Sequence, residues 1–150
     1  METTKRRRVE THKDLDAWIG AMALTVRIYR ITAGFPREEL YGLTSQMRRA
    51  GVSIAANIAE GFGRGQTTQF VQFLRIAQGS VQELDTHVLL SEQLGYLDEI
   101  TSRQLQADCA SVGRLTRGLL RSLQDRIERE ASQRNRPPSA IIDTEHQRPR

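Results

Sequence analysis

Hydrophobic residues recur along this chain at intervals of three and four positions, the spacing that places side chains on one face of an α-helix. The first predicted helix begins at Asp14, whose side chain can cap its amino end, and "AGFPREE" ends it. Its apolar positions are Leu15, Ile19, Met22, Val26 and Tyr29. No stretch alternates apolar and polar residues convincingly, as a half-buried strand does.

Three more predicted helices follow the same pattern. The second has its apolar positions at Leu40, Leu43, Met47, Ala50, Ile54 and Ile58, and "GFGRGQTT" breaks it. The third runs from about Thr68 to Leu94, with Phe70, Leu74, Ala77, Val81, Leu84 and Val88 on one seam. The fourth runs from about Asp98 to Ala131, with Leu105, Cys109, Val112, Leu119 and Leu123 inward. Four long helices with short connections predict an all-α fold, an antiparallel up-down-up-down four-helix bundle over residues 14–131.

The third helix has a second seam beside the first. Its members are Phe73, Ile76, Ser80, Glu83, His87, Leu90 and Leu94. A helix covered only by its bundle mates needs one apolar stripe, so the second seam favours burial against another subunit. The alternative is that this helix is the central one of a monomeric bundle.

Charge is concentrated at the two ends of the 150-residue chain, whose formal net charge is +4. Residues 1–13, which include "KRRR", predict a basic flexible tail, and the Pro- and Arg-rich residues 132–150 predict a disordered one. Between them, acidic residues outnumber basic ones by one. The single cysteine, Cys109, and the absence of a signal-like apolar segment favour a reducing cytoplasm.

Candidate catalytic and metal-binding motifs are weak. The glycines of "GFGRG" follow a predicted helix, whereas nucleotide-binding loops follow a strand, so a helix end is the better interpretation. His87 is the only histidine in the predicted bundle, and no Glu-x-x-His motif of a di-metal bundle occurs. The sequence therefore predicts no enzyme, no cofactor and no metal site.

A polar seam lies on the second helix instead, because Arg49, Ser53, Asn57 and Glu60 recur at spacings of four, four and three. If the second and third helices are antiparallel, Asn57 lies near residues 73–76, Ser53 near residues 77–80 and Arg49 near Glu83. We expect Arg49 to pair with Glu83, in the same chain or in a neighbouring subunit. This seam is then a packing and assembly element, and not an active site.

Two blocks of sequence, "YGLTSQMRRAGVSIAANIAEGFGR" and "FLRIAQGSVQELDTHVLLSEQLGYL", resemble the bacterial four-helix-bundle proteins encoded in intervening sequences of large-subunit ribosomal RNA genes. Those are similar to the accessory variability proteins of diversity-generating retroelements. The resemblance runs from about residue 13 to 125. Matching positions are Gln46, Arg49, Ser53, Asn57, Glu60, Gly61, Arg64, Phe73, Gly79, Ser80, Glu83 and Thr86. One departure is Ala55, where that family usually has proline.

The resemblance implies a protomer that assembles into a homopentameric ring and a role linked to nucleic acid. In the retroelement branch the ring binds a reverse transcriptase and RNA or DNA, which makes it a reverse transcriptase accessory factor. For the intervening-sequence branch the role is largely unknown, and a shared fold does not decide between them.

A basic stripe on the fourth helix supports nucleic-acid binding. Arg103, Arg114, Arg117 and Arg121 lie on one side of that helix, and a ring would multiply the stripe into a belt. The alternative for the stripe is a solvated face that Asp125 partly neutralises. The alternative function is a protein-binding or self-assembling scaffold with no nucleic-acid role, which the slightly acidic bundle favours.

Overall fold

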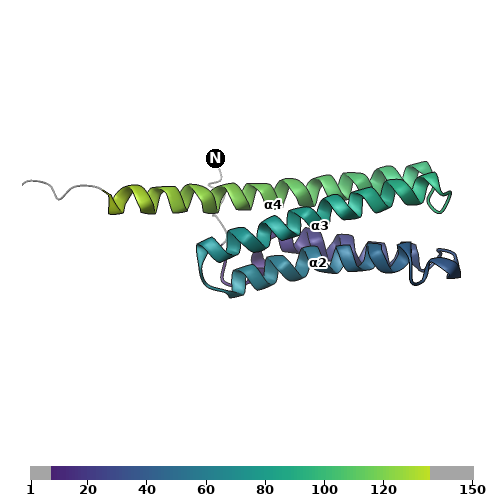
Figure 1. The fold of residues 1–150 in the computed structure, drawn as a ribbon, viewed down its shortest axis with the longest axis horizontal. Helices are drawn as coiled ribbons and strands as arrows, with labels where there is room; N and C mark the ends of the chain where they lie inside the picture. Colours follow the sequence, from purple (N-terminus) through teal and green to yellow (C-terminus); the bar gives the residue numbers. More distant parts are fainter. Residues whose placement is uncertain (1–7, 136–150) are drawn as a thin grey trace, which may run out of the picture.

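The computed structural model describes residues 8–135, which form helices and turns and contain no strand. Two short 3₁₀ helices and four α-helices follow one another: η1 (His12–Asp14), α1 (Asp16–Thr32), η2 (Arg37–Glu39), α2 (Leu43–Gly63), α3 (Thr67–Gln93) and α4 (Glu99–Arg134). The α-helices lie side by side with their long axes roughly aligned (Figure 1). The all-α prediction is confirmed. None of these helices is long and apolar enough to cross a membrane.

The core lies between the four α-helices, and α2 and α3 supply most of it. The predicted inner seams of these two helices are buried along their length, from Leu43 to Ile58 and from Phe70 to Val88. On α4, Leu105, Cys109 and Val112 are buried as predicted. Leu119 and Leu123 are partly buried against the same core. The period of the hydrophobic pattern therefore selected the inner faces of three helices correctly.

The predicted inner face of the first helix is wrong except at Leu15, which precedes α1 and is buried in the core. Ile19, Met22, Val26 and Tyr29 are each at least 40% exposed. The buried positions of this helix are Ala17, Ala21, Leu24, Thr25, Ile28 and Thr32. Small residues let the backbones of α1 and α2 approach closely, because a Cβ atom placed on Gly51 would lie 3.1 Å from the Thr25 hydroxyl. That hydroxyl is itself satisfied by the Ala21 carbonyl at 2.7 Å.

The ends of α1 and α2 also differ in detail from the sequence prediction. Asp14 belongs to a capping box with Thr11 in η1, and α1 begins two residues later, at Asp16. Leu40 was assigned to the apolar seam of the second helix, but it precedes α2 and is 51% exposed. The amino end of α2 is capped instead by Glu39, whose carboxylate accepts a hydrogen bond from the Leu43 amide at 2.8 Å.

The "GFGRG" segment holds two different kinds of glycine. α2 continues through Gly61 to Gly63, so these two residues are helical and do not break the helix. Gly65 forms the turn into α3 with a positive φ of 69°, which a residue with a side chain rarely adopts. The helix-end interpretation therefore holds for Gly65.

The fourth helix is longer than the other three and extends beyond them at its carboxyl end (Figure 1). It begins at the predicted place, where the Asp98 carboxylate accepts a hydrogen bond from the Thr101 amide at 2.7 Å. This bond also lowers the pKa of Asp98, because it stabilises the charged form. α4 ends at Arg134, three residues after the predicted end at Ala131. Residues 1–7 and 136–150 of the two predicted tails lie outside the described residues.

Candidate functional site

The predicted basic stripe lies on α4, and all four of its arginines are exposed. They differ in their partners. Arg103 pairs with Glu99 one turn away, at 2.6 Å. Within residues 8–135, no ion pair is recorded for Arg114, Arg117 or Arg121. Three guanidinium groups on one face are therefore available to an anionic partner.

Asp125 does not form the ion pair with Arg121 that the solvated-face alternative suggests, as far as the described chain records. Its recorded contact is made by the backbone, where the Asp125 carbonyl accepts a hydrogen bond from the Arg129 side chain at 3.1 Å. Further along α4, Arg126 pairs with Glu130 at 2.9 Å. Of the charged residues beyond Arg121, only Arg126 and Glu130 form an ion pair that is recorded in the described chain. We call Arg114, Arg117 and Arg121 the α4 basic face.

The middle of the polar seam links α2 to α3. The Ser53 and Ser80 hydroxyls lie 2.8 Å apart, as the antiparallel register predicts. Asn57 donates to the Ser53 carbonyl at 2.8 Å and to its hydroxyl at 3.0 Å. Ser80 can also donate to the Ile76 carbonyl at 3.2 Å. These half-buried groups satisfy one another, so they fix how α2 and α3 pack.

The two ends of the polar seam are exposed and charged. Glu60 lies in the last turn of α2 and forms an ion pair with Arg64, the residue directly after this helix, at 2.6 Å. At the other end, the structure records no Arg49–Glu83 ion pair in the described chain, and both residues are exposed. The Glu83 carboxylate instead lies 3.4 Å from the His87 ring.

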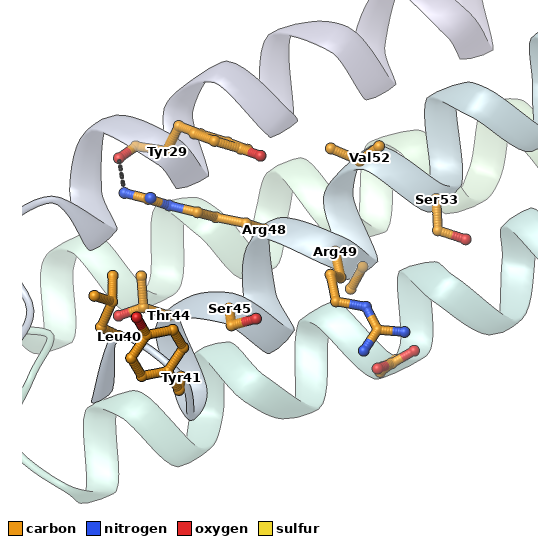
Figure 2. A pocket seen from close by; sticks show the side chains of 11 residues that line it. Tyr29, Leu40, Tyr41, Thr44, Ser45, Arg48, Arg49, Val52 and Ser53 are labelled. Atoms are coloured by element: carbon orange, nitrogen blue, oxygen red, sulfur yellow. Dashed lines mark hydrogen bonds between the residues drawn. The ribbon is translucent and has the colours of Figure 1, made fainter. Parts of the chain in front are cut away.

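Arg49 and Glu83 do face one open groove, of about 710 Å³, formed by α1, α2 and α3. Figure 2 shows Arg49 and Ser53 extending from the same side of α2 into this region. Tyr29 and Arg48 lie on the opposite rim, with the guanidinium carbon 4.6 Å from the centre of the tyrosine ring. Arg48 is already engaged, because it donates to the Thr32 hydroxyl at 3.0 Å.

The sequence interpretation missed this groove. Tyr29 was assigned to the core of the first helix, and the 93%-exposed Tyr41 was not singled out. The paired arginines of "MRRAG" could have indicated the groove, because Arg48 and Arg49 both line it. The sequence pattern placed only Arg49 on the polar seam. The groove combines aromatic and apolar walls with two arginines and one carboxylate, a mixture that is typical of a protein contact.

Cys109 has no exposed position from which to act as a nucleophile. It is 1% exposed, and burial raises the pKa of its thiol to about 12, with a further contribution from the nearby carboxylates of Asp85 and Asp108. A thiol with this pKa stays protonated near neutral pH and is a poor nucleophile. The geometry supports a packing role.

Comparison with known proteins now identifies the family. The family model described as 23S rRNA-intervening sequence protein matches residues 13–118. The chain belongs to this family. The match includes the whole polar seam, Arg103, Arg114 and Arg117, and it ends before Arg121.

A solved structure supports the fold of this family member. The crystal structure of a protein of unknown function from the S23 ribosomal protein family, from Bacteroides thetaiotaomicron, is similar with a TM-score of 0.63. It is 20% identical over 69% of this chain and 97% of that chain. None of the curated proteins matches the chain.

Proposed function

We propose that this member of the intervening-sequence family is a non-catalytic protein that binds RNA or DNA through the α4 basic face. The observation that carries the proposal is that Arg114, Arg117 and Arg121 are exposed on one side of a helix without recorded ion pairs in the described chain. Guanidinium groups bind phosphate oxygens in a bidentate manner and release counterions from the nucleic acid.

We further propose that copies of this up-down-up-down bundle form a ring of five. Two exposed apolar stripes support self-association. One is formed by Ile19, Met22 and Val26 on α1. The other is interrupted by polar residues: it has Ile76 and Leu90 on α3 and Leu94 directly after it, with Ser80, Glu83 and His87 between them. Apolar stripes of this length are unusual on a monomer. A ring would present several α4 basic faces to one nucleic acid, and the combined affinity would exceed that of a single face.

The nucleic-acid proposal is tested with a fluorescent single-stranded RNA, its DNA equivalent and a salt titration. We expect binding that weakens steeply with salt and depends little on sequence, because phosphate contacts carry no sequence information. Changing Arg114, Arg117 and Arg121 together to Glu should abolish it. A matched control changes Arg30, Arg37 and Arg49 to Glu, which alters the net charge equally at exposed positions outside α4.

A truncation separates the α4 basic face from the charged ends. Deleting residues 1–8 and 136–150 removes most of both basic ends but keeps the Thr11 capping box and all of α4. Loss of binding in the truncated protein, together with retention in the α4 triple variant, would assign binding to the ends and refute the proposal. Light scattering tests the ring, for which the mass should be near five times the 17.0 kDa of one chain.

The second candidate function is a protein-binding scaffold. The groove between Tyr29, Tyr41 and Arg49 favours it, because its walls suit a protein side chain better than a phosphate. A reverse transcriptase is the partner that the family resemblance implies, and an accessory role beside such an enzyme in the cytoplasm unites both functions. A chain that binds neither RNA nor DNA at low salt, yet captures a reverse transcriptase encoded nearby, would favour the scaffold.

A further inference from the structure

A hollow between α3 and α4 adjoins the α4 basic face. It has a volume of about 290 Å³ and opens to solvent. Its polar and glycine lining is Arg75, Gln78, Gly79, Gln82, Gly113 and Arg117. Each helix therefore contributes one arginine and one glycine. Only Arg117 had been assigned to a nucleic-acid contact from the sequence.

The two glycines create this hollow. A Cβ atom on Gly79 would meet nothing within 4 Å, so the missing side chain leaves open space on α3. A Cβ atom on Gly113 would lie 3.3 Å from Nη1 of Arg117. The guanidinium thus folds closely over the backbone of α4 at Gly113. This position keeps Arg117 beside the hollow and limits its freedom before any ligand binds.

The donors around the hollow lack acceptors. In the described chain, no ion pair is recorded for Arg75 or Arg117. The side-chain nitrogen of Gln78 is buried and has no hydrogen-bond partner. A buried donor without an acceptor is unfavourable, and Gln78 is also one of the residues that line the hollow. Asp85 and Arg117 both line an adjoining hollow, and no ion pair between them is recorded in the described chain.

We propose that this hollow binds one phosphate group of the nucleic-acid backbone, held between Arg75 and Arg117 with the amides of Gln78 and Gln82 as further donors. Two guanidinium groups from two helices can clasp an anion bidentately, and neutral amides add hydrogen bonds without requiring a particular base. The inference rests on the nucleic-acid function proposed above. It adds α3 to the binding surface and names the chemistry that one hollow recognises.

The test fills the hollow without changing charge. In the full-length protein, Gly79→Leu places a side chain in the open space, and the control Gly63→Leu does so on α2, where a Cβ atom also meets nothing within 4 Å. We expect Gly79→Leu to weaken RNA binding by ~10-fold and to lower the slope of log K against log salt by about one, as loss of one phosphate contact does. Gly63→Leu should bind as the unaltered protein does.

A second variant guards against misfolding of Gly79→Leu, which thermal unfolding and light scattering would reveal. Arg75→Gln should give the same loss and the same change in slope, whereas Arg30→Gln, an exposed arginine on α1, should give neither. If the unaltered protein binds RNA and the Gly79→Leu and Arg75→Gln variants bind it equally well, the phosphate site is refuted. The proposal that the α4 basic face binds RNA would still stand.

Inorganic phosphate separates failure of the site from failure of the nucleic-acid function. In amide-detected NMR spectra of the full-length protein, phosphate should shift the Gly79 backbone and Gln78 side-chain signals saturably, and Gly79→Leu should abolish the effect. If phosphate shifts these NMR signals saturably but the protein binds no RNA, the phosphate site is supported and the proposed nucleic-acid function is refuted. If no saturable shift occurs and no RNA is bound, both are refuted.

Discussion

Gly61 on α2 and Gly79 on α3 are both glycines inside long helices, but their surroundings are opposite. A Cβ atom on Gly61 would lie 2.7 Å from Cβ of Phe73 and 2.8 Å from the Phe70 ring. On Gly79 the same atom would meet nothing within 4 Å. The α2–α3 contact thus uses glycine to bring two helices together, whereas the α3–α4 groove uses it to keep space open. Only the first kind of glycine is required for the fold.

The largest expected effect tests this requirement directly. Gly61→Ala forces a methyl group against Phe70 and Phe73, so it should lower the free energy of unfolding by roughly 1–3 kcal/mol, as overpacking of a core does. Chemical denaturation measures the change. Gly63→Ala, two residues along the same helix and in open space, is the control and should not be destabilising. Equal stability of the two variants would show that the α2–α3 contact tolerates side chains at Gly61.

The polar part of the α2–α3 contact should contribute less. Ser53→Ala removes the hydroxyl that lies 2.8 Å from Ser80 and should cost about 1 kcal/mol of unfolding free energy. Ser80 keeps the Ile76 carbonyl as an acceptor, and Asn57 keeps the Ser53 carbonyl, which limits the loss. A double-mutant cycle with Ser80→Ala measures the coupling. Strict additivity of the two changes would show that the hydroxyl pair does not stabilise the contact.

Gly79→Ala should have the opposite sign. Alanine is favoured over glycine in a helix interior by up to ~1 kcal/mol, and nothing obstructs its methyl group here. We expect a higher melting temperature together with weaker binding of RNA, because the methyl group occupies part of the hollow. A Gly79→Ala variant that is more stable and binds RNA equally well would show that the hollow does not take part in RNA binding.

The smallest effect is expected at the charged end of the polar seam. Arg49→Met and Glu83→Leu should each change the unfolding free energy of the protomer by less than about 0.5 kcal/mol, because both residues are exposed and no ion pair joins them in the described chain. Denaturation below and above the concentration at which copies associate tests whether they matter in an assembly. A cost of several kcal/mol in the isolated chain would restore the buried ion pair that the sequence suggested.

The sequence by itself determined the helices and the inner faces of three of them, α2, α3 and α4. The seams of α2 and α3 combine large apolar residues at helical spacing, such as Met47 and Leu84, with polar residues between them, so only one face of each helix can be buried. Spacing along those helices also placed Ser53 opposite residues 77–80, which include its observed partner Ser80, since a short turn around Gly65 leaves little freedom in their register. Asp98 marked the start of α4 because its short acidic side chain can cap a helix.

Only the tertiary structure decided which of two apolar stripes on α1 faces the core. Both have helical spacing, and the stripe with alanine and threonine is buried because α2 approaches α1 closely at Thr25, a contact between residues far apart in the chain. The same holds for the arginines. Spacing placed four of them on one side of α4 and put Glu99 one turn from Arg103, but only the packing of α3 against α4 brought Arg117 beside Arg75. Periodicity describes one helix at a time, and a site between two helices depends on how they pack.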